Sequence, residues 1–112
     1  MNDRLPTGIA VSALVRLVDQ AGGSAMVLAR GDRDSGSVLL LVEERGAPTR
    51  LFERGFDRKG RRGVVAVGPQ DGDPLAILDY WQRRRRSDPD LWVVEVCVAE
   101  AQRLAAETIF AD

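Results

Sequence analysis

The stretch "SVLLLVEERGAPTRLFERGF", residues 37–56, predicts two β-strands joined by a short turn. "SVLLLVEE" is a short apolar run, and "RGAP" interrupts it with residues that favour turns. In "TRLFERGF", Leu51 and Glu53 fall on one face of an extended chain, and Phe52 and Arg54 fall on the other. Because the connection is short, we expect the two strands to lie side by side and antiparallel.

Two further strands are expected next to this pair. "SAMVLAR", from Ser24, comes before it across the Asp- and Gly-rich turn "GDRDSG", and these runs predict a β-hairpin. "VVAVG", from Val64, comes after it across the polar loop "DRKGRRG". Since the links are short, we expect an antiparallel meander of four strands.

The N-terminal segment predicts a helix that begins near Ile9. Thr7 is placed to cap this helix, and Gly22 and Gly23 end it. Apolar residues recur at three- and four-residue spacing along one face of the helix: Val11, Leu14, Val15, Val18 and Ala21.

A second helix is expected from Leu75 to about Arg86, and a third in the C-terminal tail. Asp73 and Pro74 supply the cap and the first residue that open a helix. The apolar stripe of the second helix consists of Ile77, Leu78 and Trp81. The tail "AEAQRLAAETIF" is rich in Ala and places opposite charges three and four residues apart, which favours a helix.

A fifth strand, "LWVVEV", is expected between the second and third helices. Leu91, Val93 and Glu95 share one face of it. The opposite face carries Trp92, Val94 and Val96. We expect Trp92 and Trp81 to face each other between this strand and the second helix and to act as core residues.

The expected elements follow the order α-β-β-β-β-α-β-α. Strands joined mostly by short links, with helices before and after them, are typical of an α+β domain. We therefore expect a single domain over residues 1–112. Its sheet is expected to be mainly antiparallel, with four to five strands and with the helices packed on one face.

The charges of the chain nearly cancel. Its 16 basic and 17 acidic side chains leave a net charge of −1. A global field that attracts nucleic acid or a membrane is therefore excluded, and such a role requires a local patch. The chain has no His, which removes the commonest general base and the commonest metal ligand. No phosphate-binding loop or dinucleotide fingerprint is present, so no cofactor is expected.

Cysteine content and hydropathy indicate a cytoplasmic location. Cys97 is the only cysteine, so no internal disulfide can form, and a reducing compartment is expected. The N-terminus lacks the apolar core of a signal peptide, and no window approaches ~18 consecutive apolar residues. A membrane span is therefore not expected. Cys97 has no His partner and follows an apolar strand, so we interpret it as a small core residue.

Four consecutive arginines occupy the end of the second helix: Arg83, Arg84, Arg85 and Arg86. At about 100° per residue they point around the whole helix, so the four side chains cannot all reach one groove of a ligand. In the last turn they lie near the partial negative charge of the helix dipole, which stabilises them there. We interpret the run first as a solvated helix end.

A second basic stretch keeps an anion-binding alternative open. Residues 50–62 contain six cations and two carboxylates. The cations of the loop are Arg58, Lys59, Arg61 and Arg62. If the fold brings this loop next to Arg83–Arg86, the two segments form a patch that attracts phosphate groups. The chain has only six Phe, Trp and Tyr residues, which are few for stacking nucleic-acid bases.

Three acids near the fifth strand provide a metal-site alternative. Asp88 and Asp90 precede the strand and Glu95 lies within it, an arrangement that resembles metal-dependent nucleases. Such sites also require a Lys two residues after the Glu, and Cys97 stands at that position. We therefore interpret Glu95 first as a strand-end carboxylate that is solvated or paired with an Arg.

The turn before the second strand also contains acids. Asp32, Asp34 and Gly36 alternate like the start of a calcium-binding loop, but the remaining ligands of that motif are missing. We interpret the segment as a turn in which Asp accepts hydrogen bonds from local amides.

Three stretches together resemble one bacterial family: "RLPTGIAVSALVR", "ARGDRDSGSVLL" and "DPDLWVVEV". This is the family catalogued as domain of unknown function 1491, found mostly in alphaproteobacteria. The likeness runs from Arg4 to Val96, and the basic loop Asp57–Gly63 and the Ala-rich tail depart from it. Its most specific pieces are Arg30-Gly31-Asp32, Gly36 and the run Asp88–Glu95. The resemblance implies a stand-alone cytoplasmic domain and assigns no activity, substrate or catalytic residue.

The leading functional hypothesis is a small cytoplasmic binding or accessory module without an assembled catalytic site. Its partner is an unknown protein or a second copy of itself, because the open edge of a small sheet can pair with another strand. The first alternative is an anion or nucleic-acid binder that uses the two basic segments. The second alternative is a metal-dependent hydrolase that uses the three acids.

Overall fold

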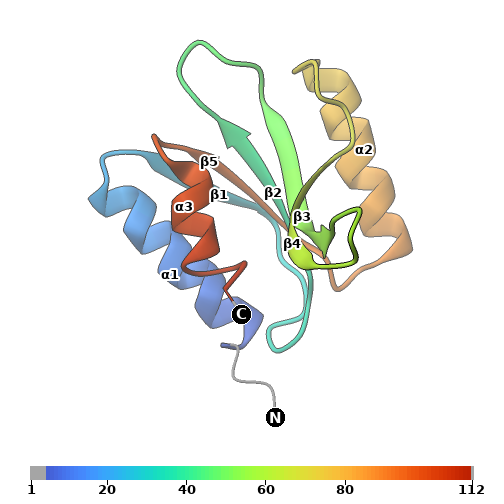
Figure 1. The fold of residues 1–112 in the computed structure, drawn as a ribbon, viewed down its shortest axis with the longest axis horizontal. Helices are drawn as coiled ribbons and strands as arrows, with labels where there is room; N and C mark the ends of the chain where they lie inside the picture. The colour runs from blue at the N-terminus through green and yellow to red at the C-terminus, as the bar shows by residue number, and fades with distance from the viewer. Residues whose placement is uncertain (1–4, 112) are drawn as a thin grey trace.

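The computed structural model describes residues 5–111, which form a five-stranded sheet with three helices (Figure 1). The expected α+β class and the order α-β-β-β-β-α-β-α are confirmed. The elements are α1 (Thr7–Gln20), β1 (Ser24–Ala29), β2 (Val38–Glu43), β3 (Arg50–Phe56), β4 (Arg62–Val67), α2 (Pro74–Ser87), β5 (Trp92–Cys97) and α3 (Ala101–Ala106).

The strand order in the sheet is β1-β5-β2-β3-β4. The β2–β3 and β3–β4 pairs are antiparallel, which confirms that part of the expected meander. The expected β1–β2 hairpin is wrong, because β5 lies between these strands, antiparallel to β1 and parallel to β2. β5 buries apolar side chains on both faces, and a central position in the sheet provides cover on both faces.

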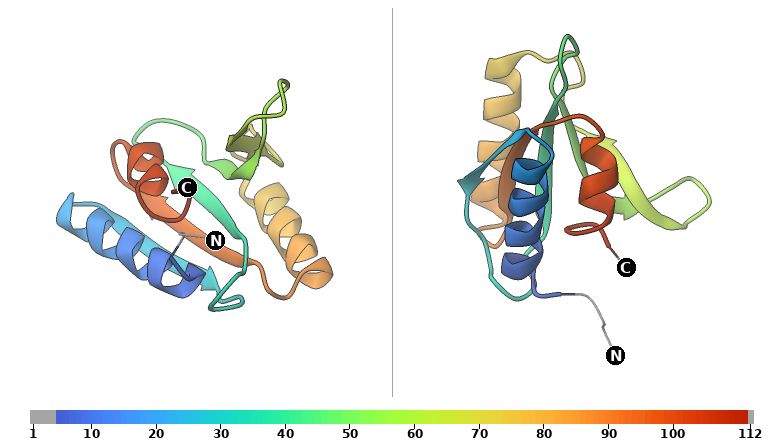
Figure 2. Two further views of the ribbon diagram at one scale, coloured as in Figure 1. Left: turned by 60° about the horizontal axis from the view of Figure 1, so that its bottom comes forward. Right: turned by 90° about the vertical axis from the view of Figure 1, so that its left-hand side faces the viewer.

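Helices cover both faces of the sheet, so the expectation of helices on a single face is wrong (Figure 2). α1 and α3 pack on one face, where Leu14 and Leu104 join the side chains of Val94 and Trp92. α2 packs on the other face, where Ile77 belongs to a second cluster. That second cluster also contains Leu39, Leu41, Leu51, Leu91 and Val93.

The two tryptophans lie in different clusters. Trp92 is buried in the cluster that α1 and α3 form with the sheet, whereas Trp81 packs at the edge of the cluster on the α2 side. The expectation that they face each other is therefore wrong. Trp92 points to the face of β5 that α1 and α3 cover, whereas Trp81 packs on the opposite face, which α2 covers. Cys97 is also placed differently from the expectation of a core residue, since it lies at the end of β5 and is exposed.

The predicted N-terminal cap of α2 is confirmed, whereas the predicted cap of α1 is wrong. Asp73 caps α2 as expected, and its carboxylate accepts a hydrogen bond from the Leu75 amide at 3.1 Å. Thr7 does not cap α1, because Pro6 occupies the cap position and Thr7 is the first helical residue. Among the described residues, no helix is long and apolar enough to cross a membrane.

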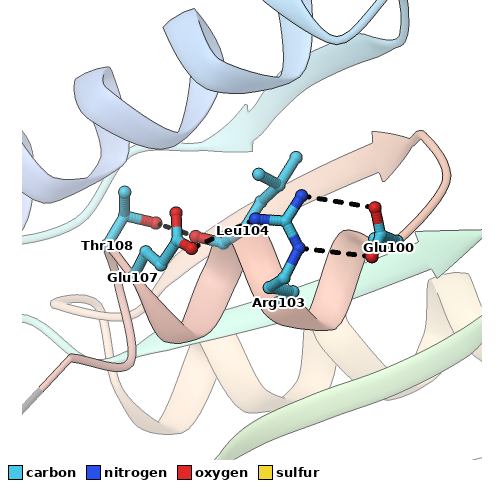
Figure 3. Close-up of polar contacts among 5 residues, drawn as sticks. All are labelled: Glu100, Arg103, Leu104, Glu107 and Thr108. Atoms are coloured by element: carbon cyan, nitrogen blue, oxygen red, sulfur yellow. Dashed lines mark hydrogen bonds and ion pairs between the residues drawn. The ribbon is translucent and has the colours of Figure 1, made fainter.

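Polar contacts within the C-terminal tail hold its shape, and Arg54 fixes the tail to β3. Arg103 on α3 bonds to Glu100 and Glu107, and these bonds raise the pKa of its guanidinium above the ordinary value, mainly through Glu100 (Figure 3). Thr108 is buried and donates a hydrogen bond to the Leu104 carbonyl at 2.9 Å. Arg54 on β3 donates to the carbonyl oxygens of the tail at Ile109 and Ala111, both at 3.0 Å.

Candidate functional site

The loop between β1 and β2 is held by hydrogen bonds to two distant segments. The indole of Trp92 donates to the Asp32 carbonyl at 2.7 Å, and the Asp32 amide donates to the Asp90 carbonyl at 3.0 Å. From the other side, the Thr7 hydroxyl donates to the Gly36 carbonyl at 2.7 Å. The three stretches that carry the family resemblance therefore meet at one place in the fold.

Close backbone packing explains the glycines of this loop. A Cβ added at Gly31 or Gly36 would overlap the carbonyl oxygen of Asp90. The Asp32 carboxylate accepts from the Ser35 amide at 2.8 Å and from the Ser35 hydroxyl at 3.1 Å. These hydrogen bonds lower the pKa of Asp32. The loop has the geometry expected for a turn held by local amides, and its motif residues serve the fold.

The three acids that the sequence offered as metal ligands have different structural surroundings. Asp88 accepts a hydrogen bond from the Asp90 amide at 3.1 Å, as a turn residue does. Glu95 lies in β5 between Met26 of β1 and Leu41 of β2. Over residues 5–111, no group of three His, Cys, Asp or Glu side chains is arranged to hold a metal ion. The structure does not bring Asp88, Asp90 and Glu95 together as such a group.

The arginine run at the end of α2 is largely engaged with the protein itself. Arg84 makes a bidentate pair with Glu53 on β3, at 3.0 and 2.9 Å, and also donates to the Tyr80 hydroxyl at 2.9 Å. The bonds to Glu53 raise the pKa of the Arg84 guanidinium above its ordinary value. Arg85 donates to the carbonyl oxygens of Pro89 and Leu91.

The other two arginines of the run are exposed. Arg83 forms an ion pair with Asp79, one helical turn earlier, at 3.0 Å. Arg86 has no ion pair with a carboxylate in the part of the chain that the structure describes. Arg84 therefore connects α2 to the sheet, Arg85 connects it to the turn before β5, and only Arg83 and Arg86 point into solvent.

The predicted basic loop forms the end of a projecting β-hairpin. We call residues 55–63 the arm, since β3 and β4 continue there from the pair Gly55 and Gly63 to a tight turn. Figure 2 shows the arm extending away from the sheet on the side of α3, whereas α2 lies on the opposite side. The structure therefore does not bring the cations of the arm together with Arg83–Arg86.

The turn of the arm is shaped by Asp57. Its carboxylate accepts from the Lys59 amide at 2.8 Å and from the Arg61 amide at 2.9 Å. Asp57 also forms an exposed ion pair with Arg61 at 3.6 Å. Arg58, Lys59 and Arg62 have no ion pair with any carboxylate of residues 5–111.

A groove that the sequence did not indicate runs between α1 and the outer edge of β1. One hollow, of about 1090 Å³, lies between α1 and the residues Val27, Arg30 and Arg33. A second hollow lies between α1 and the other end of β1, at Ser24 and Ala25. Both are lined by Ser12, Val15 and Arg16, so the groove follows the whole strand.

The family resemblance is confirmed by comparison with known proteins. The model of DUF1491, a protein family of unknown function, matches residues 5–106. A crystal structure of a DUF1491 family protein from Caulobacter crescentus is 33% identical to this chain, with a TM-score of 0.74, and the match covers 89% of this chain and 94% of that one. An NMR structure of a DUF1491 family protein from Caulobacter crescentus is 31% identical, with a TM-score of 0.74 and coverage of 92% and 94%.

A third similar structure comes from another bacterium. The solution structure of protein Atu0922 from A. tumefaciens is 28% identical, with a TM-score of 0.73, and the match covers 90% of this chain and 92% of that one. The search of curated proteins gave no match. With a family model that matches 5–106 and two family structures above 30% identity, the chain belongs to the DUF1491 family.

Proposed function

We propose that this protein is a small cytoplasmic binding module that pairs with a second copy of itself through strand β1. The observation that carries the proposal is the free outer edge of β1 beside the α1 groove. A free edge offers unpaired backbone amides and carbonyls to another strand. An added strand would also place alternate side chains over the groove, as in known modes of strand addition.

The faces of the sheet limit the register of this pairing. A two-fold axis perpendicular to the sheet keeps the α1 face of both copies on one side, so opposite residues must belong to the same face. Met26 alternates with Ala25 and Val27, which pack toward α1, and is 61% exposed. A pairing centred on Met26 meets this condition and shields both copies of its side chain from water.

Charges at the two ends of β1 support the same arrangement. Asp19 lines the groove at the Ser24 end of the strand. Arg30 and Arg33 line it at the Ala29 end. Arg16 lines both hollows, so it does not distinguish the two ends. In an antiparallel pair, Asp19 of each copy approaches Arg30 and Arg33 of the other, which is favourable for association.

Two further observations support a cytoplasmic location. Cys97 is a free, exposed thiol, and such a thiol persists in a reducing compartment. The described helices include none that could span a membrane.

The test is sedimentation of the purified protein over a range of concentrations. A six-residue strand makes a small interface, and small interfaces belong to weak complexes, so we expect monomer at about 1 μM and dimer at about 500 μM. The substitution Met26→Lys places two cations at the axis and should keep the protein monomeric at the high concentration. Leu75→Lys adds the same charge at a 77% exposed position of α2 and should leave the dimer intact.

Two results would end this proposal. One is a wild-type protein that remains monomeric at every concentration. The other is a dimer that Met26→Lys leaves unchanged, because that dimer would use a different surface. Circular dichroism should show the same folded state for both lysine variants, since both replaced side chains are exposed.

A further inference from the structure

The arm combines free cations with an exposed aromatic ring, and neither feature contributes to the core. Every arm residue except Gly55 is exposed. The stretch from residue 57 to residue 62 holds four cations and one carboxylate, so its net charge is +3. Since the whole chain has a net charge of −1, the remaining residues together carry −4. The arm is therefore a local positive site on an otherwise acidic protein.

The single carboxylate of the turn does not neutralise these cations. Asp57 is committed to the backbone amides of Lys59 and Arg61, which fix the shape of the turn. Its ion pair with Arg61 is exposed, and exposed pairs contribute little. The positive charge of the arm therefore remains available to a ligand.

Phe56 lies among these cations. It is 67% exposed, although burial of a Phe side chain would stabilise the fold. Phe56 is paired with Arg62 across the hairpin, so the two side chains share one face of the arm. Val64, at the base of the same face, is also partly exposed. An aromatic ring beside a guanidinium on a solvated face is suited to a ligand that has both flat rings and negative charges.

We infer that the arm is a binding site for single-stranded nucleic acid. Phosphate groups would be held by the cations Arg58, Lys59, Arg61 and Arg62, and an unstacked base would lie on the ring of Phe56. A single strand is thin enough to contact the arm alone. A wide anionic surface, such as a membrane, would also approach the acidic remainder of the molecule and would be repelled by it.

The test is fluorescence anisotropy with a labelled 20-nucleotide oligothymidylate and the full-length protein. Four contacts between cations and phosphates predict a slope of about −3 in the plot of log affinity against log salt concentration. Between 50 and 200 mM salt, affinity should then fall by about 50-fold. Phe56→Ala should weaken binding by about tenfold, since it removes the stacking surface.

A matched pair of charge variants tests the location of the site. Arg58→Gln with Arg62→Gln should reduce the salt slope to about −1.5, because two of the four cations are removed. Arg83→Gln with Arg86→Gln removes two exposed cations from α2 and should leave both the affinity and the slope unchanged. Heparin, which has sulfates but no bases, should bind Phe56→Ala as well as it binds the wild type.

Several results would overturn the inference. Wild-type protein that does not bind the oligonucleotide at 20 mM salt is one. Equal losses in the arm variant and the α2 variant would indicate a diffuse charge effect and not a site on the arm. An unchanged affinity of Phe56→Ala, or vesicles of anionic lipid that bind more tightly than the oligonucleotide, would exclude base stacking as the basis of recognition.

Discussion

Arg84 on α2 and Arg62 on the arm carry the same side chain in opposite surroundings. The guanidinium of Arg84 is partly buried and bonds to both carboxylate oxygens of Glu53 and to the Tyr80 hydroxyl. Arg62 is exposed, and none of the described carboxylates forms an ion pair with it. The first side chain fastens a helix to the sheet, and the second leaves its charge to the solvent or to a ligand.

The difference lies in what the fold places next to each basic segment. β3 passes beneath the last turns of α2 and presents Glu53 to Arg84, and the turn before β5 presents carbonyl oxygens to Arg85. The arm extends away from the sheet, on the side opposite α2 (Figure 2). Consecutive arginines in a sequence therefore need not form a free cationic surface, because the fold can engage some of them with its own carboxylates and carbonyl oxygens.

The largest effect within this comparison is expected for Arg84→Ala. It leaves the partly buried Glu53 carboxylate without its partner, and we expect the free energy of unfolding to fall by about 2–3 kcal/mol. Urea unfolding of both single variants and of the Arg84→Ala, Glu53→Ala double variant measures the coupling, which should be about 1–2 kcal/mol. A coupling near zero would show that this pair does not hold α2 to the sheet.

A smaller effect is expected for Arg85→Ala. This change removes hydrogen bonds to the carbonyl oxygens of Pro89 and Leu91, so the unfolding free energy should fall by about 1 kcal/mol. Arg83→Ala is the control, because Arg83 makes only an exposed pair with Asp79, worth about 0.5 kcal/mol or less. Equal losses in the two variants would contradict a structural role for Arg85.

Signals that act over a few residues were sufficient to predict most of the elements. The cap at Asp73 and the first helical residue, Pro74, fixed the start of α2. The alternation of Leu51 and Glu53 with Phe52 matches the two faces of β3, since Leu51 packs toward α2 and Phe52 toward α1. Periodicity and caps depend on the local chain, and these are properties that a sequence displays directly.

The order of the strands could not be predicted from such local signals. β5 is inserted between β1 and β2, and its partners are distant in the chain. One signal for this placement is present in the sequence: "LWVVEV" is apolar on both faces, which is typical of a central strand with cover on both sides. That signal also argues for helices on both faces of the sheet.

The candidate site was predictable only in part. The loop cations Arg58, Lys59, Arg61 and Arg62 were identified from their charge, and the structure places them at the end of the arm. Phe56 was not identified, because one aromatic residue in a strand usually belongs to the core. The pairing of Arg84 with Glu53 spans 31 residues and has no signature in either segment.

The most direct test of the central claim compares the stability of two variants that each lose two positive charges. In urea unfolding, Arg84→Gln with Arg85→Gln should lower the unfolding free energy by about 3 kcal/mol, because both side chains connect α2 to its surroundings. Arg58→Gln with Arg62→Gln should change it by less than about 0.5 kcal/mol, because exposed side chains without partners contribute little. Similar losses in the two variants, or a larger loss in the arm variant, would contradict the division of these arginines into structural and free groups.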